Sequence, residues 1–422
     1  MKIIRSIKDI TNKIEEGVPY DAYKSAYNSA FSAIVRHPFE TLKLKDRLLM
    51  SLLSVLRNNK KITFEEYYVS KIFFYVYWIA VSARDFFSSR FRHWEFSCQQ
   101  NNVLDGRDYI TCSKGIQRAR SYYLMGEDVY DVPLIKKYSN LNISDRLKVL
   151  KLMFGMKCYS YWHAAQFYVL DKTKPRAKNL KVIVMEEGVD YAGRCFLYLL
   201  KNENTKTVLT YATASTSGLR ESVGFDRVIT NNFLGKENFN RSDVELLPFP
   251  PNVDIRSFKR AKTRCIGYAP DIGSPILSSK KKIAMDESFF CVSKMQRYNV
   301  KVTVHPQDNR GRYDKFLVSN LIDYRCEPTV EEFLSSIDIL VTWWSSLIFQ
   351  AVYCGVPVII FDRYSAGHVD ALMKYSNGFV RIAASGDDLQ ASIEFFRSLP
   401  GELLTAMHMK CRRSLFYGVM DQ

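Results

Sequence analysis

The stretch IDILVTWWSSLIFQAVYCGVPVIIFD, from Ile337 to Asp362, decides the fold. Its two ends are short apolar runs rich in Ile and Val, and its middle repeats apolar residues at helical spacing up to Gly355. This pattern predicts a strand, a helix and a second strand, which together make a parallel βαβ unit. Two serines, Ser345 and Ser346, stand where the first strand gives way to the helix.

The same alternation continues in both directions along the chain. Further strands are predicted at VIVM (182–185), TVLTYA (207–212), RVIT (227–230), VELLPF (244–249), CIGYAP (265–270), VKVTV (300–304) and FVRIA (379–383). The proline-rich segment PFPPN, residues 248–252, separates two blocks of strands. We therefore predict an α/β protein with two Rossmann-like domains, 1–250 and 251–400, and a C-terminal helix, 401–422, that could cross back.

Residues 1–100 read differently from the rest of the N-terminal domain. Runs such as LKDRLLMSLLSVLRNN and FEEYYVSKIFFYVYW repeat apolar residues at helical spacing, and no clean strand is recognisable. The longest apolar run, Ile72 to Ala83, is shorter than the ~20 residues that span a bilayer. We expect a mainly helical extension and, because the N-terminus does not resemble a signal peptide, a cytoplasmic protein.

Composition excludes several classes of protein. The chain has 422 residues, 47% apolar and 25% charged, which is typical of globular proteins. Its nine cysteines include no CxxC pair, which argues against a disulfide framework and a structural zinc site. No GxGxxG motif follows a predicted strand and no P-loop sequence occurs. Dinucleotide enzymes and P-loop NTPases are therefore not indicated.

The chain carries a formal net charge of +16. Such a charge favours polyanionic partners, which include nucleic acid, an anionic membrane surface and phosphate-bearing substrates. No helix-turn-helix, zinc-finger or RNP motif accompanies the basic residues. A solvated basic surface without a specific partner is the plainer alternative.

Polar residues follow several of the predicted strands. Ligands of open parallel sheets bind outside the carboxyl ends of the strands. His305-Pro306, Ser345-Ser346, the loop from Tyr268 to Asp271, and Glu186-Glu187-Gly188 all stand at such ends. Each has a structural alternative: a histidine bonded to a nearby carbonyl, a helix N-cap, a turn, or a charged βα loop. Together they predict one cleft between the two domains.

Taken in order, these motifs resemble those of the bacterial GT-B glycosyltransferases that use CMP-activated sugars, above all the bacterial sialyltransferases. Those enzymes share an acidic-acidic-Gly motif, a His-Pro motif and a Ser-Ser/Thr motif, and the resemblance spans residues 180 to 365. It implies a GT-B-like fold with two Rossmann-like domains facing a central cleft.

The resemblance also implies catalytic roles. Glu187 would be the general base that deprotonates the acceptor hydroxyl, and His305 would protonate or stabilise the departing CMP phosphate. Ser345 and Ser346 would bind that phosphate. The remaining positions implied to contact substrate or nucleotide are Glu186, Tyr268, Asp271, Pro306 and Glu327, the last of these on the ribose.

The implied reaction is an inverting transfer that needs neither a metal nor another cofactor. Sialic acid or a related nonulosonic acid would move from its CMP donor to a hydroxyl of a bacterial surface glycan, such as lipooligosaccharide, O-antigen or capsule. The enzyme would then work at the inner face of the cytoplasmic membrane, near lipid-linked acceptors.

Two alternatives remain open. Residues 342–362 equally resemble capsule and teichoic-acid polymerases that use CMP-Kdo or a CDP-polyol. The net charge of +16 keeps open a protein of another class, one that binds nucleic acid without catalysis.

Overall fold

The computed structural model describes most of the predicted elements. Its described residues are 9–10, 13, 22, 25–26, 44–88, 91–96, 104, 107–113, 129–155, 161–175, 180–185, 191–211, 225–238, 243–246, 265–270, 286–292, 294, 298–303, 322–323, 330–343, 345, 347–361 and 368–419.

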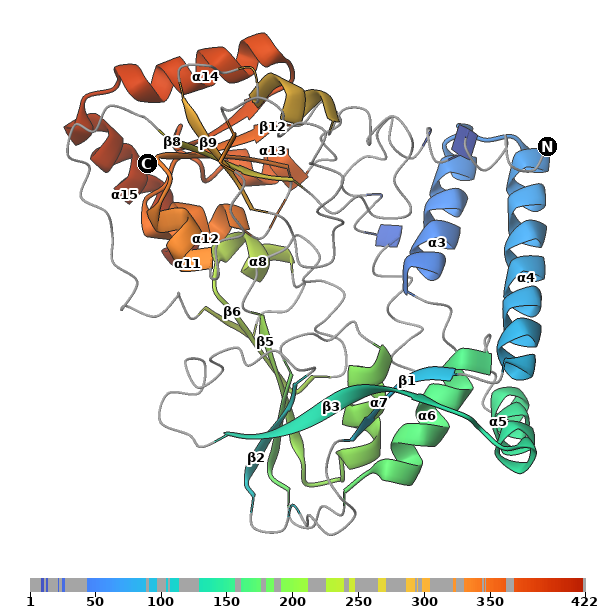
Figure 1. Ribbon diagram of the computed structural model, residues 1–422. Coiled ribbons are helices and arrows are strands. Elements are labelled where there is room, and N and C mark those ends of the chain that lie inside the picture. Colours follow the sequence, from blue (N-terminus) through green and yellow to red (C-terminus); the bar gives the residue numbers. More distant parts are fainter. Residues whose placement is uncertain are drawn as a thin grey trace.

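The first sheet has seven strands in the order β1-β3-β2-β4-β5-β6-β7 (Figure 1). All neighbouring pairs are parallel except β1 with β3. The strands are β1 (Phe91–Phe96), β2 (Tyr109–Ser113), β3 (Val129–Ser139), β4 (Val182–Met185), β5 (Lys206–Tyr211), β6 (Arg227–Thr230) and β7 (Val244–Leu246). The helices that follow β3, β4 and β6 are α5 (Ile143–Gly155), α6 (Tyr161–Thr173), α7 (Tyr191–Leu200) and α8 (Phe233–Asn238).

The second sheet has six parallel strands in the order β10-β9-β8-β11-β12-β13. Its strands are β8 (Cys265–Ala269), β9 (Asn299–Val302), β10 (Ile322–Asp323), β11 (Ile339–Thr342), β12 (Val358–Phe361) and β13 (Val380–Ala383). Numbered within this domain, the order is 3-2-1-4-5-6, which is the doubly wound Rossmann order.

Helices cover both faces of the second sheet. Leu340 and Ile360 pack on one face with the helices α11 (Val330–Ser335), α12 (Leu347–Cys354), α13 (His368–Met373) and α15 (Gly401–Tyr417). Val341 and Ile359 point to the other face, towards α14 (Gly386–Ser398) and the helical residues 286–292. Strands buried on both faces read as continuous apolar runs, which explains why the sequence predicts them well.

The N-terminal region is helical but also contributes a strand. Helices α3 (Leu44–Asn58) and α4 (Phe64–Phe87) lie along one side of the molecule, and α5 lies beyond the end of α4 (Figure 1). The prediction of two Rossmann-like sheets in a GT-B-like α/β arrangement, with a helical N-terminal region, is confirmed. The expectation that residues 1–100 contain no strand is wrong, because β1 joins the first sheet as an edge strand.

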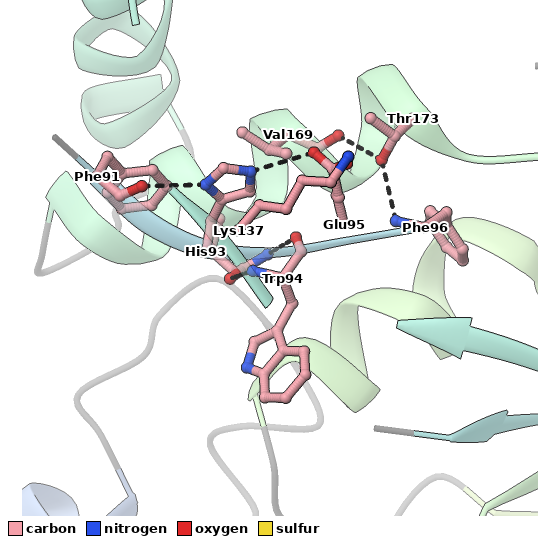
Figure 2. A network of polar contacts seen from close by, with 9 residues as sticks. Phe91, His93, Trp94, Glu95, Phe96, Lys137, Val169 and Thr173 are labelled. Carbon is pink, nitrogen blue, oxygen red and sulfur yellow. Dashed lines mark hydrogen bonds and ion pairs between the residues drawn. The ribbon is translucent and has the colours of Figure 1, made fainter. Parts of the chain in front are cut away.

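Side chains of α6 form hydrogen bonds with main-chain groups on the outer edge of β1 (Figure 2). The Gln166 amide accepts from the Trp94 nitrogen at 2.8 Å and donates to the Trp94 carbonyl at 2.6 Å. Further along, the Thr173 hydroxyl accepts from the Phe96 nitrogen at 3.4 Å. An uncovered edge strand invites pairing with another chain, so α6 closes the sheet at this side.

A partly buried ion pair network stiffens the same strand (Figure 2). The His93 ring lies between the Phe91 carbonyl at 3.2 Å and the Glu95 carboxylate at 3.3 Å, and Glu95 also pairs with Lys137 of β3. Burial raises the pKa of Glu95, but Lys137 and His93 outweigh this effect and hold that pKa below its ordinary value. The network thus links β1 to β3 through side chains as well as main chain.

The C-terminal helix contacts α8, the helix that follows β6 of the first sheet. Leu234 of α8 belongs to the core that α12 and α15 share, and the Phe233 ring lies 6.0 Å from the Tyr375 ring. Gly418 ends α15 in the left-handed conformation, with φ of 68°. A Cβ there would lie 2.5 Å from the Phe233 ring, so the end of α15 is packed directly against α8.

Gly267 allows α11 to approach the centre of the second sheet. A Cβ on Gly267 would lie 2.3 Å from Cδ1 of Ile337 and 2.9 Å from Cζ of Phe333. We expect Gly267→Ala to lower the free energy of unfolding by about 1–3 kcal/mol, the usual effect of overpacking a core. Urea unfolding measures this change.

Gly155→Ala provides the matched control for this substitution. Gly155 ends α5, and a Cβ added there would meet nothing within 4 Å. The same added methyl group should there leave stability unchanged. Equal effects of the two substitutions would contradict the assigned contact between β8 and α11.

Candidate functional site

The predicted nucleotide-side residues follow neighbouring strands of the second sheet. β8 lies between β9 and β11, with Tyr268 aligned to both Val302 and Val341. The loop after β8, the segment after β9 that contains His305, and the turn to Ser345 therefore start side by side. This is the switch point of a doubly wound sheet, where neighbouring connections leave towards opposite faces and open a crevice.

Hydrogen bonds fix the carboxyl ends of these strands to one another. The Thr342 hydroxyl at the end of β11 donates to the Ala269 carbonyl at 2.7 Å. The Thr303 nitrogen, just past β9, donates to the Tyr268 carbonyl at 3.0 Å. Thr342 is fully buried, so this bond operates away from competing water. The edge from which the three loops depart is consequently rigid.

Ser345 lies two residues before helix α12 and bonds to its first turn. Its hydroxyl accepts from the Leu347 nitrogen at 3.2 Å, and its carbonyl accepts from the Ile348 nitrogen at 3.1 Å. The hydroxyl of this half-buried residue thus caps the helix, which is the structural role that the sequence analysis gave as the alternative to phosphate binding. An accepting hydroxyl keeps its own hydrogen to donate, so capping is compatible with an anion at the same helix end.

Tyr268 points away from the carboxyl edge. Its side chain is fully buried beneath the sheet, and its hydroxyl lies 2.6 Å from the Ser288 hydroxyl, to which the Trp343 indole nitrogen also donates. The tyrosine hydroxyl is therefore part of the core. The Tyr268 carbonyl is bonded to the Thr303 nitrogen as well, so the predicted ligand contact of Tyr268 has no support in the described structure.

Most of the other predicted site residues lie outside the described part of the chain. These residues are Glu186, Glu187, Asp271, His305, Pro306, Glu327 and Ser346, together with the linker 248–252. Their roles, like the cleft they would line, stay predictions. The strand before each of the functional groups is nevertheless placed: β4 before Glu186, β9 before His305 and β10 before Glu327.

Helix α12 is held from behind by a buried histidine of α15. His408 is 1% exposed, and its Nε2 donates to the Val352 carbonyl at 2.8 Å. Burial lowers the pKa of His408 to about 4, with a further lowering by Arg412 that the Val352 bond only partly offsets. The ring is therefore neutral at physiological pH and serves packing and orientation of α12.

The first sheet also ends in polar residues that the sequence analysis passed over. Thr230, Asn231 and Asn232 follow one another at the carboxyl end of β6, and all three are fully buried. The Asn232 amide donates to the Asn231 side-chain oxygen at 2.7 Å. The sequence did contain this signal, because Asn231 and Asn232 directly follow the strand RVIT and the strand-end rule applies to them equally.

Two further observations concern the described residues alone. Among them, no three His, Cys, Asp or Glu side chains gather as a metal site would require. Within the same residues, no helix combines the length and apolarity needed to cross a bilayer.

Comparison with known proteins finds likeness in structure only. No protein-family model matches the chain, and no curated protein matches it in sequence. Among solved structures, the wall teichoic acid polymerase TagF soaked with CDPG is 13% identical, with 74% of this chain and 85% of that one covered at a TM-score of 0.40. The S. aureus MnaA–UDP structure is 10% identical, with 72% and 90% covered and a TM-score of 0.43.

A third similar structure is the glycotransferase of kitacinnamycin. It is 12% identical, with 72% of this chain and 94% of that chain covered and a TM-score of 0.41. Likeness at this distance concerns the fold and assigns no activity.

Substitutions at Ser345 test its capping role. Ser345→Ala removes the acceptor for the Leu347 nitrogen and should lower the free energy of unfolding by ~1 kcal/mol. Ser345→Asp retains an acceptor oxygen and should unfold at nearly the wild-type denaturant concentration. Equal losses in the two variants would show that the hydroxyl does not cap α12.

His408 should make stability depend on pH. Because the folded-state pKa is about 4 and an unfolded histidine has one near 6.5, the unfolded chain alone binds this proton between those values. Stability is complete above pH 6.5 and falls as pH drops towards 4, by on the order of 3 kcal/mol from this residue. Urea unfolding at pH 7.5 and 4.5 measures the change.

His408→Gln is the control, since glutamine can donate to the Val352 carbonyl but does not titrate. Other groups also respond to acid, so the relevant quantity is the difference in slope between wild type and variant. Parallel pH profiles would rule out the buried neutral histidine.

Proposed function

We propose that this chain is a GT-B-type glycosyltransferase that takes its sugar from a CMP donor. The sugar is sialic acid or a related nonulosonic acid, and the acceptor is a hydroxyl of a bacterial surface glycan. CMP-Kdo and CDP-polyol donors are the alternatives within the same class.

One observation carries this proposal: the strand order β9-β8-β11 at the centre of the second sheet. The loop after β8, the segment after β9 that contains His305, and Ser345 after β11 are scattered over the sequence, yet they follow strands that are direct neighbours. The motif resemblance depends on the sequence alone and not on this strand order. Independent segments that converge on one switch point support a shared ligand better than any single short motif does.

The helix end at Ser345 supports binding of the donor phosphate. The Leu347 and Ile348 nitrogens are already bonded to Ser345, so a phosphate would there meet the hydrogen of the Ser345 hydroxyl and the positive end of the α12 dipole. The hydrogen bonds between the strand ends and the bond from His408 to the Val352 carbonyl hold this helix in place. A phosphate would therefore meet groups that are already oriented, which lowers the cost of ordering them on binding.

The transfer can be written with this chain's residues. Glu187 removes the proton from the acceptor hydroxyl, whose oxygen attacks the anomeric carbon from the face opposite CMP. The bond from that carbon to the phosphate oxygen breaks, and CMP leaves with the electron pair. His305 donates a hydrogen bond or proton to the leaving phosphate. Attack from the opposite face inverts the anomeric centre, and no metal is required.

Nucleotide-induced thermal stabilisation tests the donor. CMP, CDP, UDP and GDP are added separately at millimolar concentration with EDTA present, and the midpoint of unfolding is measured. CMP should raise the midpoint most, and His305→Ala should diminish the shift. A larger shift with CDP or UDP would redirect the donor while keeping the fold, and no shift with any nucleotide would overturn the proposal.

Ser345→Asp separates phosphate binding from helix capping. It keeps the cap but places a carboxylate where the donor phosphate would lie, so it should abolish the CMP shift without lowering the midpoint of the free protein. An unchanged CMP shift in this variant would place the phosphate elsewhere. A protein that binds nucleic acid in a salt-sensitive way, and shows no shift with any nucleotide, would favour the non-catalytic nucleic-acid-binding alternative.

A further inference from the structure

Helix α4 has two apolar faces, and the protein covers only one of them. The buried face carries Tyr67, Ser70, Phe74 and Trp78 at helical spacing. The opposite side is exposed and also apolar, although helices of globular proteins normally turn charged residues to solvent. Its members are Tyr68 (39% exposed), Val69 (37%), Ile72 (60%), Tyr75 (42%), Val76 (57%), Ile79 (70%) and Phe87 (77%).

Helix α5 extends this surface. The Arg146 guanidinium of α5 donates to the Phe86 carbonyl at 3.1 Å, which joins α5 to the end of α4 (Figure 1). Ile143, Leu147 and Phe154, at 77%, 55% and 72% exposure, lie along one side of α5. Of the twenty large apolar side chains exposed in the described part of the chain, nine lie on α4 and three on α5. We call the seven α4 side chains named above and these three α5 side chains the α4–α5 surface.

The charges around the α4–α5 surface are mainly basic. Exposed cations flank both helices: Arg57, Lys60 and Lys61 before α4, Arg84 within it, Lys136 and Lys137 at the end of β3, and Lys148 and Lys151 on α5. Several of these charges are paired with each other: Arg84 with Asp85, Lys137 with Glu95 and Lys148 with Asp145. Glu65 of α4 is exposed on the same side as Val69 and Ile72, and the remaining cations outnumber it. Glu66 pairs with Lys13, and Asp85 and Asp145 pair with cations while only 14% and 13% exposed.

The exposed apolar side chains and the basic charges together indicate which kind of partner the α4–α5 surface would bind. A second copy on the same surface would bring like charges together, which disfavours self-association. Nucleic acid would use the cations and stack on aromatic rings, but it would have no use for Ile72, Val76 and Ile79. An anionic bilayer uses both features, because apolar side chains enter the acyl boundary while lysines and arginines meet the headgroups.

We propose that the α4–α5 surface binds an anionic lipid bilayer, with α4 lying in the plane of the interface. Tyr67, Phe74 and Trp78 keep the inner face of α4 on the protein, while the outer face enters the lipid. The inference does not rest on the proposed transferase activity, since it uses no residue of the candidate site.

Vesicle flotation of the full chain tests this proposal. Vesicles contain either phosphatidylcholine alone or phosphatidylcholine with phosphatidylglycerol. Wild type should float with the anionic vesicles, less with neutral ones, and less again at high salt. The double variant Ile72→Glu/Ile79→Glu puts two carboxylates on the exposed face and should weaken binding at least about tenfold. Both positions are exposed, so folding should be preserved, and the unfolding midpoint checks this.

Leu403→Glu/Met409→Glu is the matched control. These residues are 48% and 44% exposed on α15, so the variant has the same change in charge on an exposed helix elsewhere. It should float as wild type does. Equal losses in both double variants, or flotation of Ile72→Glu/Ile79→Glu at the wild-type level, would overturn the proposal.

Two further measurements, of the oligomeric state and of the thermal shift with CMP, cover the remaining outcomes. If wild type ignores anionic vesicles but elutes as a dimer that Ile72→Glu/Ile79→Glu converts to a monomer, the surface binds a second copy and the bilayer proposal is wrong. The thermal shift with CMP, measured on the same variants, should be unaffected. A wild-type protein that shows the CMP shift but does not float would overturn this inference alone, and one that floats but shows no CMP shift would overturn the proposed transferase alone.

Discussion

The second domain depends on the position of β8. This first strand of the sheet is hydrogen-bonded on both sides, to β9 and to β11, so the chain adds β9 and β10 on one side and then crosses to add β11 on the other. Asp338 reinforces one end, since its main-chain nitrogen and carboxylate bond to the carbonyl and nitrogen of Cys265 at 2.8 and 2.9 Å. Thr342 reinforces the other end. The strand order therefore reverses at β8, which is where ligands of doubly wound sheets generally bind.

Burial explains which elements could be predicted. VIVM coincides with β4, and the strands at 265–270 and 379–383 differ from β8 and β13 by one residue, because buried parallel strands are short apolar runs. β1, FRHWEF, escaped detection since Arg92, His93 and Glu95 dilute its alternation. The partners that make those residues acceptable, such as Lys137 and Gln166, come from elements far along the chain and are set by tertiary structure.

The strands that precede the candidate site were predictable from the sequence, but the direction of the side chains was not. The strand-end rule locates its loops, since it depends only on the parallel arrangement of strands. It does not say which side chains turn inward. Tyr268 alternates with Gly267, and the small residue faces α11 while the tyrosine fills the opposite core. That choice follows from the proximity of Phe333 and Ile337, which no local pattern reveals.

Helix α12 is also part of the contact between the second domain and the first sheet. α12 is capped by Ser345 at one end and bonded by His408 of α15 along its length, and α15 ends against Phe233 of α8. α8 in turn follows the buried polar end of β6. Packed elements thus connect the start of α12 with the carboxyl edge of the other sheet. Because His408 is buried and neutral, its contact with α12 does not depend on exposed charges that salt would screen.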